Sequence, residues 1–132
     1  MENKLLVHKH LIIRAEVARP PQSESFFRVW LNFFIREIGM KTMSGPHVKY
    51  SHVKGNKGLT GIAVIETSHI AAHFWDEVSP ALMQFDVYSC SEFDPIKICN
   101  KIKKDFGATK IAYKFLDREH DLTEIPLDIK KK

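Results

Sequence analysis

Residues 59–75 read LTGIAVIETSHIAAHFW and hold two apolar runs separated by a short polar break. The runs 59–66 and 69–75 have the length and the β-branched and aromatic content of strands. The break Glu66-Thr67-Ser68 lies where the chain must reverse, so the two strands are expected to form a hairpin. This hairpin is the centre around which the other elements of the sequence can be placed.

Further strands are predicted on both sides of the hairpin. An alternating pattern predicts one over residues 5–17, with Leu11, Ile13 and Ala15 on one side. An irregular strand, interrupted by Gly45-Pro46, is expected over residues 43–53, and a turn or flexible loop over residues 55–58. The remaining strands are expected over residues 82–89 and 108–116.

Two helices are signalled by their caps. Ser23 can cap a helix that runs to about Ile38 and ends at Gly39. Asp94, with Pro95 at the first helical position, begins a second helix that Gly107 closes. In the first helix, Arg28, Asn32 and Arg36 form one solvated stripe. The rest of its surface is apolar and is expected to lie flat on a sheet: Phe26, Phe27, Trp30, Phe33, Phe34 and Ile38.

The resulting order is strand, helix, four strands, helix, strand, followed by a polar tail after Asp117 that we expect to be only partly ordered. Hairpin-connected strands with two helices predict an α/β (α+β) fold, a two-layer sandwich with a mostly antiparallel sheet and both helices on one face. We expect residues 1–132 to form a single domain.

Composition removes several classes of protein. The formal charge is +4, but the basic residues do not interleave with aromatic ones, so nucleic-acid binding is not expected. Cys90 and Cys99 make neither a disulfide framework nor a metal-binding pair. No signal peptide and no apolar run of membrane-spanning length is found. We therefore expect a protein of the reducing cytoplasm without a membrane partner.

The candidate catalytic and ligand residues lie between Thr60 and Cys90. A serine hydrolase would need an exposed nucleophile elbow, and no Gly-x-Ser-x-Gly is present around Ser68. A metal site could use His69 and His73, but these lie far apart along a strand and no third ligand completes the set, so no metal is expected. A covalent carbonyl cofactor is the third possibility, and it accounts for the most residues.

The order of these residues resembles the processing site of the bacterial and archaeal class of S-adenosylmethionine decarboxylase. That family carries Glu-Ser-His-Ile/Leu, a histidine five residues after the serine, Trp-Pro-Glu, and a strand ending in Asp-Val-Phe-Thr-Cys. The corresponding residues here are Thr67-Ser68-His69-Ile70, His73, Trp75-Asp76-Glu77 and Asp86-Val87-Tyr88-Ser89-Cys90. His10-Leu11, Thr60-Gly61 and Asp94-Pro95 are also similar to the family at their positions.

The resemblance implies self-cleavage between Thr67 and Ser68. The hydroxyl of Ser68 would attack the carbonyl of Thr67 and turn the peptide bond into an ester, a step that a tight hairpin favours by holding the groups together. Thr60 would stabilise the oxyanion or carry its proton. His73 would remove the α-proton of Ser68, and elimination followed by hydrolysis would leave a pyruvoyl group on the longer chain.

The implied cofactor is this covalent pyruvoyl group, which would form a Schiff base with the substrate amine and draw electrons as CO2 leaves. Cys90 corresponds to the family's cysteine and is the candidate proton donor. Glu77 corresponds to a carboxylate that could bind the ribose hydroxyls of the substrate. The family works as a dimer with shared sites, so a homodimer of processed chains is implied.

The chain departs from the family pattern at three places. Thr67 replaces the usual glutamate, and its β-branched side chain crowds the carbonyl that Ser68 must attack, so processing is expected to be slow. The loop after Glu77 is two residues longer. Lys54 stands where the family has an aromatic residue that stacks on adenine, although Tyr50 could replace that ring.

Three hypotheses therefore stay open. The first is a self-processing S-adenosylmethionine decarboxylase that serves spermidine synthesis, and the second is the same chemistry on a basic amino acid, arginine or ornithine. The third is a non-catalytic relative whose serine is never cleaved. Taken singly, Ser68, His73 and Cys90 have plain interpretations as turn, strand and core residues. Their joint order favours the catalytic hypotheses.

Overall fold

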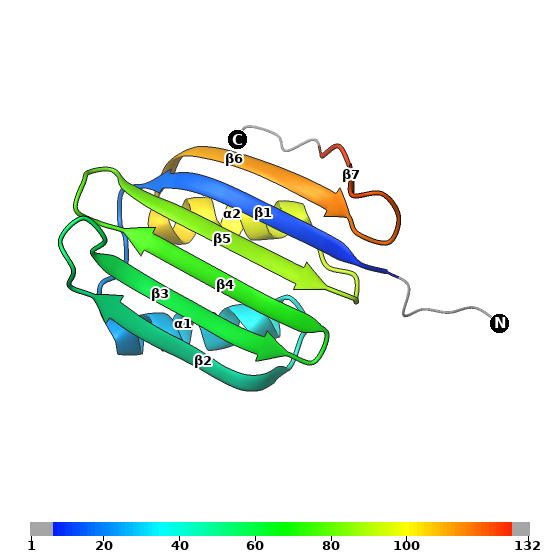
Figure 1. Ribbon diagram of the computed structural model, residues 1–132, viewed down its shortest axis with the longest axis horizontal. Helices are drawn as coiled ribbons and strands as arrows, with labels where there is room; N and C mark the ends of the chain where they lie inside the picture. Colours follow the sequence, from blue (N-terminus) through cyan, green and yellow to red (C-terminus); the bar gives the residue numbers. More distant parts are fainter. Residues whose placement is uncertain (1–6, 128–132) are drawn as a thin grey trace.

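The protein is represented by a computed structural model, in which residues 7–127 are described. Its elements follow one another in the order that the sequence predicts, with one short strand added at the end (Figure 1). They are β1 (Lys9–Val17), α1 (Glu24–Glu37), β2 (Thr42–Ser51), β3 (Gly58–Ile65), β4 (Ser68–Trp75), β5 (Ala81–Ser89), α2 (Pro95–Phe106), β6 (Ala108–Asp117) and β7 (Thr123–Glu124).

The strands form one sheet in the order β2-β3-β4-β5-β1-β6-β7, and each neighbouring pair is antiparallel. Both helices cover the same face of this sheet, as Figure 1 shows. The predicted two-layer α+β sandwich is therefore confirmed. The polar tail contains β7, which pairs with the end of β6 and which the sequence pattern did not indicate. Within residues 7–127, neither helix is long and apolar enough to cross a membrane.

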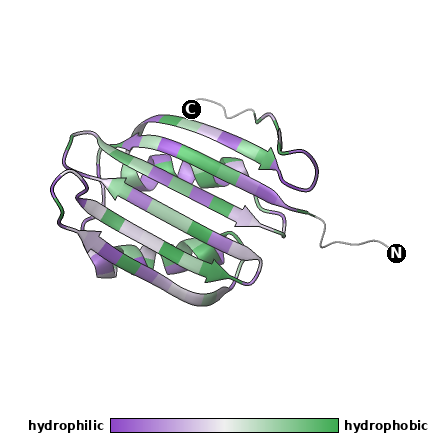
Figure 2. Cartoon of the chain, in the orientation of Figure 1, coloured by the Kyte–Doolittle hydropathy of each residue, from purple (hydrophilic) through white to green (hydrophobic). Residues whose placement is uncertain are grey.

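The alternation of side chains separates the sheet into two unlike faces. In β1, Leu11, Ile13, Ala15 and Val17 are buried, and the residues between them point to the other side. The same alternation runs through the central strands and gives them their banded hydropathy (Figure 2). We call the side without helices the open face, and the candidate chemical residues must be placed relative to it.

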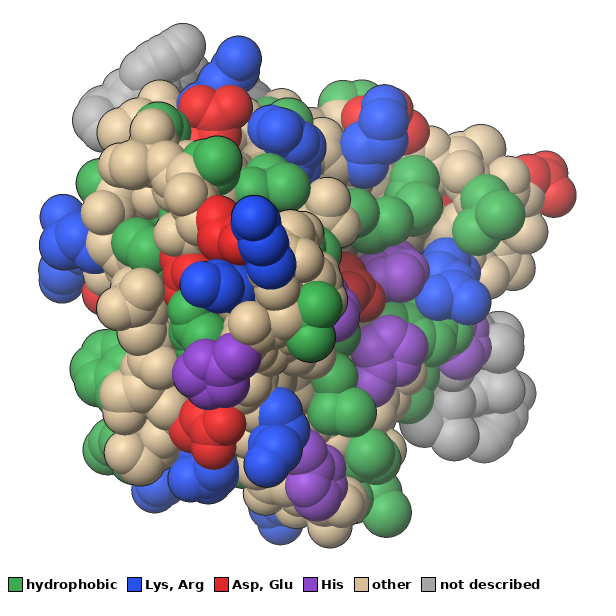
Figure 3. Space-filling model, turned by 60° about the vertical axis from the view of Figure 1, so that its left-hand side comes forward, with side chains coloured by type: hydrophobic (Ala, Val, Ile, Leu, Met, Phe, Trp, Pro, Cys, Tyr) green, Lys and Arg blue, Asp and Glu red, His purple; other side chains and the backbone are tan. Residues whose placement is uncertain are grey.

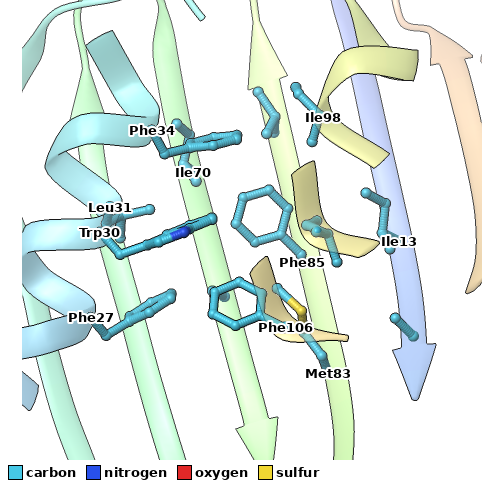
Figure 4. Packing of buried hydrophobic residues seen from close by; sticks show 14 of the residues in the cluster. Ile13, Phe27, Trp30, Leu31, Phe34, Ile70, Met83, Phe85, Ile98 and Phe106 are labelled. Carbon is cyan, nitrogen blue, oxygen red and sulfur yellow. The ribbon is translucent and has the colours of Figure 1, made fainter. Parts of the chain in front are cut away.

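The helix-covered side holds an aromatic core. The indole of Trp30 stacks on Phe34 with ring centroids 5.1 Å apart and lies 4.9 Å from the ring of Phe106 in α2 (Figure 4). Phe34 meets Phe85 of β5 edge to face at 5.3 Å. Such pairs each stabilise a core by about 1 kcal/mol beyond the area that they bury. They hold both helices on the middle of the sheet.

Helix α1 packs closely on β3 because Gly61 has no side chain. A β-carbon at this position would lie 2.8 Å from a ring carbon of Phe27, closer than real contacts allow. The neighbouring residue Thr60 points the other way, onto the open face, since consecutive strand residues alternate. A packing requirement on one side of β3 thus accompanies a candidate site residue on the other.

The apolar side of α1 is narrower than the sequence prediction made it. Ser23 caps the helix as predicted, and its Oγ accepts a hydrogen bond from the backbone N–H of Phe26 at 3.1 Å. Phe26 and Phe33, however, are 55% and 56% exposed, as is Val29 at 54%. These three lie on the outer side of the helix, so the expectation that all its aromatic residues face the sheet was wrong.

Helix α2 begins and ends where the sequence predicts. Asp94 Oδ1 accepts hydrogen bonds from the N–H groups of Ile96 and Lys97 at 3.0 and 3.3 Å, and Pro95 occupies the first helical turn. Gly107 closes the helix with a φ of 64°, a left-handed conformation that glycine adopts without strain. The chain is then placed to enter β6 antiparallel to β1.

A polar contact joins the two helices at the edge of the core. The indole N–H of Trp30 donates to Asp105 Oδ2 at 2.8 Å, and Lys101 Nζ lies 2.9 Å from the same carboxylate and 2.9 Å from that of Glu37. Burial raises the pKa of Asp105, but the hydrogen bonds from Trp30 and Lys101 and the nearby lysine charges outweigh it. The pKa of Asp105 is therefore lowered from its ordinary value.

The substitution Asp105→Ala is expected to lower the free energy of unfolding by about 2 kcal/mol, because the indole N–H of Trp30 loses its partner. The measurement is urea unfolding followed by fluorescence. Because the folded-state pKa is lowered, the charge-dependent part of the effect is present above the ordinary aspartate pKa and is lost as the pH falls through the lowered one. Glu37→Gln, which removes only an exposed ion pair, should cost about 0.5 kcal/mol. Equal losses in both variants would contradict this account.

Candidate active site

The first group of candidate residues surrounds the predicted cleavage point. Ser68 begins β4 directly after the turn, opposite Ser89 of β5, and its φ is +151°. Few residues other than glycine adopt such a φ, so the backbone at this serine is strained. The hydroxyl of Ser89 donates to Thr67 Oγ1 at 2.9 Å and holds the residue before the cleavage point.

The carbonyl of Thr67 is held at the same place. It accepts a hydrogen bond from the backbone N–H of Cys90 at 2.9 Å. A backbone N–H aimed at a carbonyl oxygen polarises it and stabilises negative charge that develops there. Cys90 itself is partly exposed and directly follows the last residue of β5. The structure therefore brings together Thr67, Ser68 and Cys90, as their order in the sequence predicts.

The second group lies on the open face of β3 and β4. Thr60 and His73 stand opposite each other in the strand ladder, and Thr60 Oγ1 is 3.2 Å from His73 Nδ1. The ring of Trp75 is nearly parallel to that of His73, with centroids 5.8 Å apart. A hydroxyl next to an imidazole can carry a proton to or from a reacting atom. Thr60 and His73 were predicted as separate candidates, and in the structure they form one pair.

The two groups do not meet within one chain. Ser68 stands opposite Ser89, whereas His73 stands opposite Gln84, five positions further along the β4–β5 ladder. Five residues of an extended strand span about 16 Å. An imidazole cannot take a proton across that distance. The Thr60–His73 pair and the Ser68 group therefore lie toward opposite ends of β4.

Glu77 lies at the His73 end of the sheet, in the loop after β4. Its Oε2 accepts a hydrogen bond from the backbone N–H of Gly55 at 2.9 Å and so ties this loop to the turn before β3. Tyr50, on β2, donates to the Asp76 carboxylate at 2.9 Å. Burial, followed by the hydrogen bond to Asp76, raises the pKa of Tyr50. Lys54 is an exposed residue of the turn.

A hollow of about 480 Å³ lies on the open face between β4, β5 and β1. It is lined by residues of all three strands, and His73 is the one from β4: His10, Ile12, Ile13, Arg14, His73, Gln84, Phe85 and Asp86. In Figure 3, histidine side chains gather on one part of the surface among hydrophobic ones. The hollow gives the open face room for a small molecule beside a titratable group.

One cluster on this face was missed by the sequence analysis, which found no third ligand to accompany His69. His10 Nε2 lies 2.9 Å and His69 Nε2 lies 3.5 Å from the same oxygen of Asp86, Oδ2. The donor atoms of the three residues lie within 4.8 Å of one another. Alternation along the strands could have indicated the shared face, but not that β1 and β4 both flank β5.

The ring nitrogen of His10 that carries the proton decides whether this cluster can bind a metal ion. Arg118 Nη1 lies 3.1 Å from His10 Nδ1. A guanidinium only donates hydrogen bonds, so Nδ1 must be the accepting nitrogen and the neutral ring carries its proton on Nε2. That proton points at Asp86, where a metal ion would need a free lone pair. The cluster is therefore a hydrogen-bonded network and not a ready metal site.

Comparisons with known proteins match most of the chain to one family. Residues 10–119 match the family model described as S-adenosylmethionine decarboxylase. A protein of Prochlorococcus marinus named S-adenosylmethionine decarboxylase proenzyme is 33% identical over 97 residues, which are 73% of each chain. One of the same name from Parasynechococcus marenigrum is 26% identical, with 86% of this chain and 87% of the relative covered.

A third relative of that name, from Carboxydothermus hydrogenoformans, is 36% identical over 64 residues, about half the length of each chain. Among solved structures, the adenosylmethionine decarboxylase of Aquifex aeolicus superposes with a TM-score of 0.68 at 20% identity, covering 85% of this chain and 90% of that one. It shares the fold. With the family model spanning most of the described sheet, the chain belongs to the S-adenosylmethionine decarboxylase family, as its central motif predicted.

Proposed function

We propose that this chain is a pyruvoyl-dependent decarboxylase of S-adenosylmethionine that cleaves itself between Thr67 and Ser68. The observation that carries the proposal is the geometry of the bond to be cut. Ser68 is strained, and the Thr67 carbonyl before it is held by the N–H of Cys90 at 2.9 Å. These are the two features that an internal attack on a peptide bond requires.

The proposed processing reaction passes through an ester between Thr67 and Ser68. The oxygen of Ser68 bonds to the carbonyl carbon of Thr67, the C–N bond breaks, and an ester with a free Ser68 amine results. Loss of the α-proton of Ser68 then breaks its Cβ–O bond and frees the Thr67 carboxylate. Water replaces the amine nitrogen, which leaves as ammonia, and chains 1–67 and 68–132 remain.

The residues present fit this cofactor, since its one precursor, Ser68, lies in a strained turn with its neighbouring carbonyl polarised. A pyruvoyl group supplies a carbonyl that withdraws electrons from the substrate as CO2 leaves. Cys90, partly exposed beside Thr67, carries a thiol proton and is proposed to return a proton to the substrate carbon.

A second copy of the chain is proposed to complete the site. The Thr60–His73 pair lies on the open face toward one end of β4, and the Ser68 group lies at the other end of the same strand. A two-fold axis that lies between two facing sheets and runs perpendicular to β4 places opposite ends of the two β4 strands over each other. Each site would then take Ser68 and Cys90 from one protomer and Thr60, His73 and Glu77 from its partner.

The surface of the open face suits such a pairing. Ile12, Ile62 and Val64 project from β1 and β3 on both sides of β4 and are 43%, 45% and 44% exposed. Apolar side chains grouped on an otherwise polar surface are typical of a protein interface. Packing two open faces together would also exclude water from the hollow beside His73.

The charge of the site bears on the second candidate, decarboxylation of arginine or ornithine. Arg14 lines the hollow beside His73, and Lys54 replaces the expected stacking aromatic in the turn. Asp86 lines the same hollow and Arg14 lies 3.7 Å from Glu16, so charge alone does not select between a basic amino acid and S-adenosylmethionine, whose sulfonium is also a cation. Release of labelled CO2 from the three amino acids compares them directly. Higher kcat/KM with arginine or ornithine would favour the second candidate.

Replacing Ser68 by alanine is expected to leave a single chain of 132 residues, because no hydroxyl remains to attack Thr67. Intact mass spectrometry of the wild type should show chains 1–67 and 68–132, the second blocked at its N-terminus. Ser79→Ala, a change in an exposed loop, serves as the control and should cleave normally. A wild-type protein that remains one chain would favour the non-catalytic relative.

Two inactive variants are expected to restore each other if the sites are shared. A chain with His73→Ala should remain uncleaved alone but be cut when co-expressed with a Ser68→Ala chain that supplies an intact His73. Random pairing leaves one complete site in half of the dimers, so about a quarter of wild-type activity is expected. Mass spectrometry identifies the cleaved His73→Ala chain. If that chain stays intact in the mixture, His73 does not act across the dimer.

Cys90→Ala is expected to leave cleavage largely intact, since the backbone N–H and not the thiol holds the Thr67 carbonyl. Its kcat should fall on the order of 100- to 10 000-fold through loss of a proton donor. The matched control is Cys99→Ala, because Cys99 is buried in α2 and burial raises its pKa to about 11. An unchanged kcat in Cys90→Ala would remove Cys90 from the reaction.

A further inference from the structure

Cleavage at Ser68 would change how the beginning of β4 is held. In the intact chain the β3–β4 turn and the contact from the Cys90 N–H to the Thr67 carbonyl keep residue 68 in place. After cleavage residue 68 is a chain end, and chain ends fray unless they are tied down. A reacting group at such an end needs another anchor, since displacement by about 1 Å can cost a hundredfold in rate.

The His10–Asp86–His69 network lies beside this new end. His69 is the residue directly after Ser68, and its Nε2 contacts Asp86 Oδ2 on β5 at 3.5 Å. The same oxygen accepts the hydrogen bond from His10 Nε2 at 2.9 Å. One carboxylate thus connects β4 to β5 and β1 on the open face, at the end of the sheet that carries Ser68.

His10, at the end of the network away from His69, is also held in place by its neighbours. Arg118 donates to His10 Nδ1 at 3.1 Å, and its guanidinium lies 3.9 Å from the ring centre of Tyr88. Tyr88 stands between the two histidines in the ladder, with ring centroids 5.4 Å from His10 and 5.7 Å from His69. Asp86 therefore accepts a hydrogen bond from His10, whose ring is oriented by Arg118 on its other side. The Asp86 side chain is only 27% exposed.

We propose that Asp86 is a positioning residue that anchors the chain end created by cleavage, acting through His69. The inference rests on the proposed self-processing at Ser68. Before cleavage the turn holds residue 68, so the contact is dispensable for processing. After cleavage the side chain of the next residue is tied to Asp86 of β5 and, through Asp86, to His10 of β1, which keeps residue 68 beside Cys90 and prevents the end of β4 from fraying.

The test compares Asp86→Ala and Asp86→Asn with the wild type. Asparagine keeps an acceptor oxygen for the histidines and alanine does not, so the effect should be larger in the alanine variant. We expect complete cleavage in both by intact mass and a KM for the substrate within about twofold of wild type. The kcat of Asp86→Ala should fall on the order of 10- to 100-fold, with partial rescue in Asp86→Asn. Glu37→Gln, which breaks an ion pair on the helix side, should match the wild type.

Hydrogen exchange gives a readout that is independent of turnover. The amides of residues 69–74 should exchange faster in cleaved Asp86→Ala than in cleaved wild type. In uncleaved chains that also carry Ser68→Ala, the same substitution should change little, because the turn is intact. His69→Ala provides a second way to break the anchor if Asp86→Ala does not fold, and it should give the same two results.

The outcomes separate this inference from the function on which it rests. If cleaved Asp86→Ala, or His69→Ala in its place, exchanges and turns over like the wild type, Asp86 anchors nothing. If the substitution slows cleavage as much as it lowers kcat, Asp86 acts on the precursor and the inference is wrong. A wild-type chain that is never cut at Ser68 fails earlier, in the mass measurement, and overturns both proposals.

Discussion

The register of β4 between β3 and β5 is the constraint on which the site depends. It sets His73 opposite Thr60, and Ser68 opposite Ser89 with Cys90 next in the chain. A slip by one residue would turn every side chain of β4 to the other face and bring His73 into the core. The buried residues of β4, Ile70, Ala72 and Phe74, oppose such a slip because they fill the side that the helices cover.

The aromatic core and the open face are consequences of the same alternation. Helices α1 and α2 meet over the sheet through Trp30, Phe34 and Phe106, so that side has no room for a substrate. Open space remains on the other face, where His73 borders the hollow and apolar residues are exposed. A small chain thus has one side for stability and one that is proposed to bind a partner and a ligand.

Strain and restraint are combined at the proposed cleavage point. The φ of Ser68 is unfavourable, and it persists because the hydrogen bonds from Ser89 to Thr67 and from Cys90 to the Thr67 carbonyl hold the turn from β5. The proposed cleavage would release both the strain and part of the restraint. The new chain end would then need a separate anchor, and the proposed anchor is the contact of His69 with the network of Asp86 and His10.

The sequence by itself determined the elements and the nature of the chemistry. Period-two patterns and the caps at Ser23, Asp94 and Gly107 act over a few residues, so the order of strands and helices could be predicted. The spacing of Ser68, His73 and Cys90 indicated the family that the comparisons confirm. These are local properties of the chain.

Only the tertiary structure decided which residues meet. It paired Thr60 with His73, separated both from Ser68, turned Phe26 and Phe33 outward, and assembled the network around Asp86. Each of these depends on which strands are neighbours and how they are aligned. Such contacts join residues distant in the chain, and no local pattern in the sequence encodes their alignment.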